Sequence, residues 1–454
     1  MEKTRRVALI LILLSSGFSV LWGSWLAHQS FSGMSDFRTI YYGSRCLLQR
    51  VNPYQPDQFL RVYRAEQWTP ELDEAKAGPF LTTITDYVYP PTTLLIIAPF
   101  AAVPWEPAAL LWLALTALSL TLGGFLIWSV AADSANRVNG ANKSLGVSLF
   151  LVCVLLANCL IIFTYANAAG LVAGLCVVAV WCFLQERFVP AGIICLAVSL
   201  ALKPHDAGLV WLYFLLAGGT YRKRALQTLA VTVVIGLPAL LWVSNIAPHW
   251  LHEMQTNIQS ASAHGALNDP GPASFDFRAP DPVIGLQSII SILRDDPRFY
   301  NAASYLVAAP LLLIWCITAL RSRITPTKTW LALAAVATLT MLVSYHRQHD
   351  AKLLLLTVPG CALLWSEGGL MGWFALTASS AGFLITGDVP SMALILLTKS
   401  VPLNTASLLG KMETILLVRP SALILLVMAF FYLWAYVRRA ESEKEEQLAD
   451  AASL

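Results

Sequence analysis

Residues that could do chemistry are few in this chain, and they gather in short clusters between long apolar runs. The first cluster, Ser35-Asp36-Phe37, follows the first apolar run by about eight residues. A carboxylate held just above a membrane by aromatic neighbours can have a raised pKa, as a general base requires. Aspartate is also a favoured helix N-cap, so Asp36 equally fits the start of a helix over residues 37–48. The two roles are compatible.

A second cluster, Lys203-Pro204-His205-Asp206, lies between two apolar runs. A lysine in such a position is rare enough in membrane proteins to indicate function. If it faces the extracytoplasmic side, its ammonium group would suit a phosphate or another anion. A lysine that merely extends its charge to the bilayer surface is the alternative interpretation.

The third cluster, residues 345–352, reads Tyr-His-Arg-Gln-His-Asp-Ala-Lys. Arg347, with His346 and Asp350 beside it, could hold a phosphate through charge-assisted hydrogen bonds. His346, His349 and Asp350 could also bind a metal ion, but their spacing matches no strong metal signature. We therefore predict no metal and no other cofactor. A solvated turn is the alternative, although a generic turn would be richer in glycine, serine or asparagine.

The composition places these clusters in a membrane protein. Of 454 residues, 57% are hydrophobic and 13% are charged, about half the charged fraction of soluble domains. A net charge of +3 is too small, over this length, to indicate nucleic-acid binding. No Walker A, Gly-x-Gly-x-x-Gly or Gly-x-Ser-x-Gly pattern occurs, which argues against a soluble nucleotide site.

The apolar runs predict an all-α polytopic membrane protein with about twelve transmembrane helices, because a helix needs about 20 apolar residues to cross a bilayer. The predicted spans are 7–27, 106–131, 145–163, 169–185, 190–202, 207–219, 225–246, 301–320, 329–345, 351–366, 370–386 and 420–437. The runs 190–202 and 207–219 are either two short spans or one broken helical pair. We expect residues 91–103 to form a short helix at the membrane surface.

Lysine and arginine in the short loops predict the orientation. Twelve spans place the N-terminus, the C-terminus and the basic short loops in the cytoplasm. The two long loops, 28–105 and 247–300, then lie outside with juxtamembrane helices, as do all three polar clusters. We predict one transmembrane domain over residues 1–437 and a short charged cytoplasmic tail over 438–454.

Taken in order, these features resemble glycosyltransferase family 87, the polyprenol-phosphate-mannose-dependent transferases of bacteria, which have the C-type membrane glycosyltransferase fold. The resemblance covers roughly residues 30–360. Its motifs are Ser35-Asp36-Phe37 with Tyr41, Asn52-Pro53-Tyr54, Tyr89-Pro90-Pro91, Asn167-Ala168-Ala169-Gly170, Lys203-Pro204, and Tyr345-His346-Arg347 with Asp350.

The resemblance implies an enzyme of the bacterial plasma membrane that takes a sugar from a polyprenyl-phosphate donor. The acceptor would be a hydroxyl of a glycolipid, a glycan or another molecule, and transfer would invert the anomeric centre. Asp36 would be the catalytic base, and Lys203, Arg347 and His346 would stabilise the leaving phosphate. Further residues implied for the cleft are Tyr41, Tyr89, Asn167, His205, His349 and Asp350.

Two positions depart from the family's usual pattern. Tyr165-Ala166 precedes Asn167 where members often have Gly-Gln, and His205 replaces the glutamine usual after Lys-Pro. A transporter or flippase of a lipid-linked or anionic substrate would also have a broken helix pair and intramembrane charges. However, the chain shows neither charges at the midplane of its spans nor an inverted repeat. A non-catalytic assembly subunit is the third alternative.

Overall fold

The computed structural model describes most of the chain, and every regular element in the described part is helical. One isolated antiparallel β-bridge, between Val283 and Arg347, is the exception to helix and loop among these residues. The all-α class predicted from the sequence is therefore confirmed. The described residues are 2–30, 32–67, 84–136, 141–274, 282–322, 324–343, 345–398 and 406–452.

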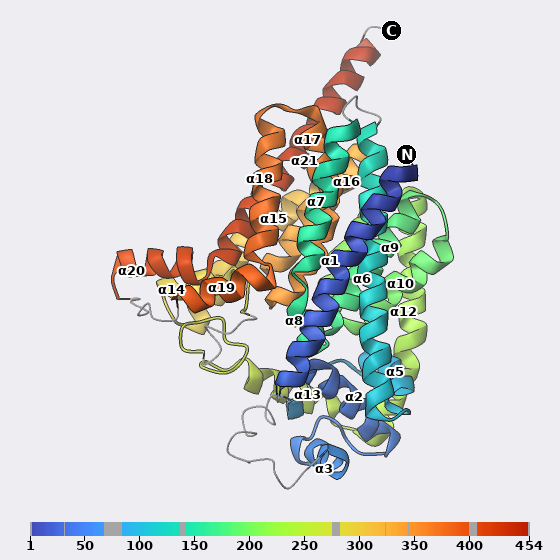
Figure 1. The fold of residues 1–454 in the computed structure, drawn as a ribbon, viewed down its shortest axis with the longest axis vertical. Coiled ribbons are helices and arrows are strands. Elements are labelled where there is room, and N and C mark those ends of the chain that lie inside the picture. The colour runs from blue at the N-terminus through green and yellow to red at the C-terminus, as the bar shows by residue number, and fades with distance from the viewer. Residues whose placement is uncertain are drawn as a thin grey trace.

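Long helices run side by side as an upright bundle, with both chain ends at the same end of the molecule (Figure 1). In the described part, seven helical segments are long and apolar enough to cross a membrane, and one further pair, bent by 67°, passes the same test together. The seven lie on α1 (Glu2–Gln29), α6 (Trp105–Asn136), α7 (Ala141–Ala157) with α8 (Leu160–Tyr165), α12 (Gly219–Ile246), α15 (Pro297–Arg321), α16 (Pro326–Val343) and α21 (Pro420–Ala452).

Four of the twelve predicted spans coincide with helices that are too short to pass this test, so the count of twelve stays a prediction. Several of them lie deep among other helices, where a backbone does not need to match the thickness of the lipid. They are α9 (Ala168–Leu184), α10 (Val189–Leu202), α11 (Pro204–Ala217), and the 3₁₀ helix η1 (Gln348–Thr357) with α17 (Val358–Glu367).

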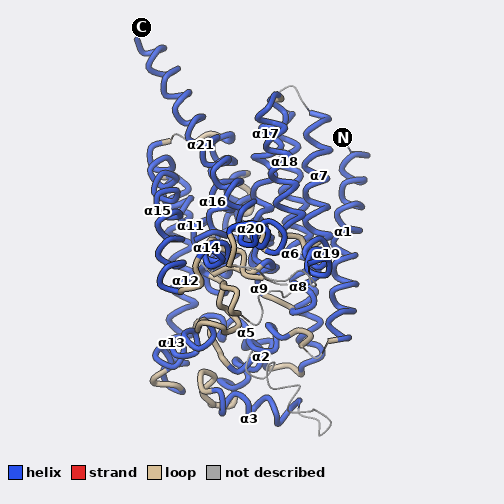
Figure 2. Tube along the Cα trace, turned by 90° about the vertical axis from the view of Figure 1, so that its left-hand side faces the viewer, coloured by secondary structure: helices blue, strands red, loops and turns tan. Residues whose placement is uncertain are grey.

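Short helices gather at the end of the bundle opposite the two chain ends (Figure 1). They are α2 (Ser35–Leu48), α3 (Pro56–Gln67), α5 (Pro91–Ala101) and α13 (Trp250–Ala261). A second group extends sideways from the bundle at mid-height, where Figures 1 and 2 agree on the position of α19 and α20. This group comprises α14 (Gln287–Leu293), α19 (Asp388–Thr398), which forms the bent pair with α18 (Gly369–Ile385), and α20 (Leu408–Glu413) with the π-helix η2 (Thr414–Val418).

The centre of the bundle is packed through small residues and one fully enclosed helix. A Cβ on Gly174 of α9 would lie 2.5 Å from the carbonyl carbon of Ser119 in α6, so the two backbones are in contact there. Such close crossings through small residues are the usual way helices associate in membranes. Nearly all of α16 is buried, and it packs on α21, η1 and α11. In contrast, α1 exposes leucines such as Leu14 and Leu21 on its outer face.

Candidate active site

The position of Asp36 is set by the turn between α8 and α9. Ala166 ends α8 with a left-handed backbone (φ 52°), and the indole of Trp112 donates a hydrogen bond to its carbonyl at 2.8 Å. One residue before the start of α2, the Met34 amide donates to the Thr164 carbonyl at 2.7 Å. The first turn of α2 is thereby tied to the chain segment that leads into α9.

Asn167 connects the two helices through both ends of its side-chain amide. The carbonyl oxygen caps α9 by accepting from the Ala169 amide at 2.7 Å, and the amide nitrogen donates to the Asp36 carboxylate. The prediction that Asp36 is itself an N-cap is wrong. The helix begins at Ser35, so Asp36 lies inside the first turn, and its carboxylate is turned to another helix.

Aromatic rings pack beside the first turn of α2, which carries Asp36, as the sequence predicted. Phe37 is fully buried and stacks on Trp112 with ring centroids 4.9 Å apart. Tyr41 packs against Phe37, and its hydroxyl donates to the Val103 carbonyl at 2.7 Å. Tyr41 therefore joins α2 to the end of α5 rather than presenting a free hydroxyl to Asp36.

The segment that follows Tyr89 explains how α5 reaches the second polar cluster. Pro90 and Pro91 start α5 without needing a backbone donor. In its first turn, the Thr92 hydroxyl donates to the Ala201 carbonyl at 2.6 Å, and the Thr93 hydroxyl donates to the Leu202 carbonyl at 3.3 Å. These carbonyls end α10, where Pro204 leaves them without a helical partner.

Lys203 lies at the break between α10 and α11 and is buried between two carboxylates. Its ammonium group contacts Asp350, and it is 3.5 Å from Asp206 Oδ2. Burial alone would lower the pKa of Lys203, but the two carboxylates outweigh it and raise the pKa, so the lysine remains protonated. Removing Lys203 would leave two buried carboxylates without their cation.

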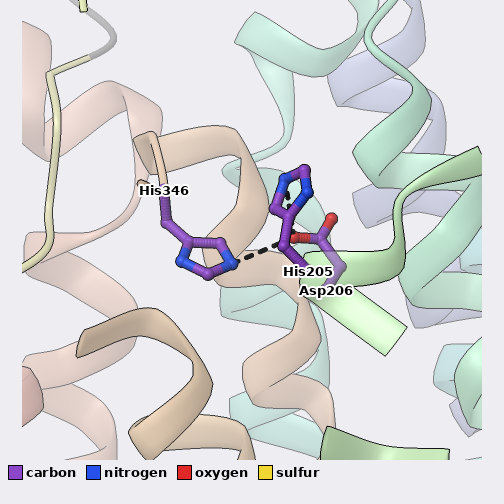
Figure 3. Close-up of side chains that lie close together, drawn as sticks. All are labelled: His205, Asp206 and His346. Atoms are coloured by element: carbon purple, nitrogen blue, oxygen red, sulfur yellow. Dashed lines mark ion pairs between the residues drawn. The ribbon is translucent and has the colours of Figure 1, made fainter. Parts of the chain in front are cut away.

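Three ligand-type side chains meet beside Lys203 (Figure 3). His346 is fully buried, and its Nε2 lies 3.2 Å from Asp206 Oδ1. His205 Nε2 approaches the same oxygen at 3.6 Å, from the adjoining residue of α11. Burial lowers the pKa of His205 to about 4, so this imidazole is neutral at physiological pH. Of the three, His205 keeps the largest accessible surface, 38% of its side chain.

The rest of the third cluster fixes the start of η1. Asp350 accepts the Arg347 amide at 2.8 Å, and His349 Nε2 lies 3.3 Å from Asp350. The Arg347 guanidinium is largely buried and donates to Tyr345 and to the Leu267 carbonyl. Arg347 thus holds the long 247–300 loop against the segment that carries His346.

Tyr89 relates Asp36 to the Lys203 cluster. Its pKa is raised chiefly by burial and next by the Asp36 carboxylate, while Lys203 opposes the rise. Hydrogen bonds give the geometry: the Ser44 hydroxyl of α2 donates to the Leu94 carbonyl of α5 at 3.0 Å, and α5 is joined through Thr92 and Thr93 to the end of α10 beside Lys203. The structure therefore brings Asp36, Asn167, Tyr89 and Lys203 into one region. His205, His346, His349 and Asp350 join it through Lys203 and Asp206.

Sequence reasoning missed Asp206 as a member of the site, and also the residues that dock α13. The Glu253 carboxylate accepts from the side chains of Asn52 and Gln55, each at 2.7 Å. The Asn257 amide donates to the carbonyls of Tyr54 and Tyr87. The signal available for Asp206 was its place in the first turn of α11, which begins at Pro204 directly after Lys203. No sequence signal linked α13 to residues 52–55, about 200 positions earlier.

The bundle of long apolar helices fits an integral membrane protein, and its interior holds a cluster of buried polar residues. Comparison with known families narrows this class. A sequence model of glycosyltransferase family 87 matches residues 87–345, more than half of the chain, so the protein belongs to that family. The matched range contains Tyr89, Asn167 and Lys203, whereas His346 is the first residue after it and Asp36 lies well before its start. Neither the curated proteins nor the solved structures that were compared with the chain gave a significant match.

Proposed function

We propose that the protein transfers a sugar from a polyprenyl-phosphate donor to an acceptor hydroxyl at the extracytoplasmic face of the bacterial plasma membrane. The observation that supports the proposal is a set of hydrogen bonds that joins α2, which carries Asp36, through α5 to the end of α10 beside Lys203, in a chain of a glycosyltransferase family. The sugar is mannose or a related hexose or pentose. The acceptor is a glycolipid, a glycan or another hydroxyl compound.

The chemistry assigns Asp36 the role of general base. Its carboxylate takes the proton of the acceptor hydroxyl as that oxygen attacks the anomeric carbon. The bond from this carbon to the donor phosphate breaks, and polyprenyl phosphate leaves with the bonding electron pair. A single displacement inverts the anomeric centre. Asn167, which donates to Asp36, keeps the carboxylate in one orientation.

Lys203, Arg347 and His346 are proposed to stabilise the leaving phosphate, where negative charge develops. Lys203 provides a permanently protonated ammonium group at the junction of α10 and α11. Asp206 and Asp350 offset much of its charge, so further positive charge is needed when the phosphate departs. Arg347 is the first permanently charged cation in the third cluster, residues 345–352.

We further propose the C-type architecture, with twelve spans and both termini in the cytoplasm. The common end occupied by the two termini in Figure 1 supports an even number of spans. Single cysteines in place of Lys223 and His252, in a background without the native cysteines, should react with an impermeant thiol reagent from opposite sides. Labelling of both from the same side would contradict this topology.

The decisive experiment measures transfer in detergent or liposomes from a radiolabelled polyprenyl-phosphate mannose. Asp36→Asn should lower the rate by about 10²- to 10⁴-fold, the range typical of a lost general base. Asp57→Asn, which changes an exposed carboxylate on α3, is the matched control and should keep the wild-type rate. Full activity of a folded Asp36→Asn variant would refute the assignment of the base. Movement of labelled donor to the opposite leaflet without glycosidic product would favour the transporter instead.

A further inference from the structure

His205, Asp206 and His346 form a cluster whose geometry is that of metal ligands. Each offers one ligand atom, and the three atoms lie within 4.8 Å of one another. Figure 3 shows both imidazoles beside the same carboxylate: His205 comes from the adjoining residue of α11, and His346 comes from the segment before η1. In the sequence His346 stands beside His349 and Asp350, whereas in the structure its Nε2 lies close to Asp206.

A second observation points to a ligand at this place. Asp206 is 2% exposed, and the polar atoms that the structure shows near its Oδ1 atom, within the described part of the protein, are the two imidazole nitrogens of His205 and His346. A buried carboxylate oxygen costs free energy unless something compensates it. The other oxygen, Oδ2, faces Lys203, so Oδ1 is directed away from that ammonium group and towards the two histidines.

The separations of the two imidazole nitrogens from Asp206 Oδ1 fit the binding of one cation. Zinc binds histidine nitrogen and carboxylate oxygen at about 2.0–2.2 Å. Neighbouring ligand atoms around such an ion are therefore about 3.0 Å apart in octahedral geometry and about 3.4 Å apart in tetrahedral geometry. The two measured separations from Asp206 Oδ1, 3.2 Å to His346 and 3.6 Å to His205, are close to these values.

We propose that His205, Asp206 and His346 bind one divalent transition-metal ion of the zinc type. Two imidazoles and one carboxylate favour such an ion over Mg²⁺ or Ca²⁺, which prefer oxygen ligands throughout. Three protein ligands leave coordination positions open, as in catalytic rather than structural zinc sites.

The open positions lie beside Lys203, and they suit an oxygen of the donor phosphate. This part of the inference rests on the proposed function. The ion adds two positive charges where Asp206 and Asp350 otherwise offset the charge of Lys203. It thereby supplies the electrostatic stabilisation that the departing phosphate needs. The ion changes no oxidation state in this role.

The test uses the full-length protein, purified in detergent and stripped with a chelator, and Co²⁺ as a spectroscopic probe of the zinc site. We expect one equivalent to bind with the visible absorption of nitrogen and oxygen coordination. His346→Ala and His205→Ala should each weaken binding by about 100-fold or more, since the loss of even an outer partner of a metal ligand costs 10- to 100-fold. Both variants leave the carboxylates around Lys203 in place.

The matched control is His264→Ala. His264 belongs to the second His–carboxylate cluster in the described part of the chain, with Asp269 and Asp295, and could bind Co²⁺ by itself. The signal should survive in this variant. A signal lost in His264→Ala but kept in His346→Ala, or wild-type binding no tighter than that of His346→Ala, would overturn the proposal.

Zinc-dependent transfer separates this inference from the proposed function. If the ion binds as described but no sugar is transferred from any polyprenyl phosphate, the metal site stands and the proposed function fails. If stripped protein binds no Co²⁺ and transfers sugar at the full rate, the metal site fails and the proposed function stands. Tight binding combined with full activity of the stripped protein would leave the site but remove its role at the phosphate.

Discussion

Replacing Asn167 by serine tests how Asp36 is positioned. Serine caps a helix about as well as asparagine, so α9 should keep its start. The shorter side chain cannot cap α9 and also reach the Asp36 carboxylate, which the asparagine amide now contacts. A hydrogen bond to a charged group contributes about 1.5–3 kcal/mol. Expressed fully in the transition state, this loss lowers the rate by about 10- to 150-fold.

The assay is transfer from radiolabelled donor over a range of donor concentrations. We expect kcat to fall while the donor KM is nearly unchanged, because the Asn167 amide contacts the base and not the donor. Asn167→Ala should lose the same activity and, in addition, about 1 kcal/mol of stability with its cap. In an Asp36→Asn background, Asn167→Ser should have little further effect, since the partner is already gone.

Three outcomes would refute this reasoning. Wild-type kcat in a folded Asn167→Ser variant would show that the amide does not orient the base. A rate that falls only in step with thermal stability, across the serine and alanine variants, would indicate a purely structural role. Independent and additive losses in the double variant with Asp36→Asn would show that the two residues act separately.

Other predictions concern the packing around the site. Lys352→Met leaves the buried Asp388 carboxylate, now 3.2 Å from the lysine, without its cation, and it should cost about 3–5 kcal/mol of stability, measured as a fall in Tm. Adding Asp388→Asn to this variant should recover part of the loss, and no recovery would contradict the pairing. Gly174→Ala should destabilise the protein by about 1–3 kcal/mol, because the new methyl group meets the backbone of α6. Gly146→Ala, with no atom within 4 Å, is its control and should be neutral or slightly stabilising; equal effects would refute close packing. Gly43→Ala would displace the buried ring of Tyr87, which lies close to the site, and should lower both Tm and the transfer rate. Unchanged kinetics would show that the ring has room to move.

Local patterns in the chain were enough to predict the helices and the polar residues between them. The breaks at Lys203-Pro204 and at Tyr89-Pro90-Pro91 were visible because proline cannot continue a hydrogen-bonded turn. The helix after the first span was also predicted, over residues 37–48, although it begins two residues earlier, at Ser35, and so cannot be capped by Asp36. Boundaries of this kind depend on the backbone angle of a single residue, here Met34, which composition does not determine.

The prediction of twelve spans rests on the hydropathy of the apolar runs. It assumes that each apolar run meets lipid, whereas α9 and η1 meet mainly other helices. A helix surrounded by protein is selected for packing, so its length carries no information about bilayer thickness. The ten-residue 3₁₀ segment of η1, which carries His349, Asp350 and Lys352 into the interior, has no signature in a hydropathy profile.

The sequence by itself determined that the protein is a helical membrane protein of a glycosyltransferase family type, because apolar length and short motifs are local properties. It also supplied the individual candidates Asp36, Asn167, Lys203 and His346. Only the tertiary structure decided their partners: Asn167 with Asp36, 131 positions apart, and Lys203 with Asp350, 147 positions apart. Pairings over such distances arise from how helices cross, and no local pattern encodes a crossing. For the same reason Asp206, part of the second cluster but not among the residues expected in the cleft, became the centre of the proposed metal site.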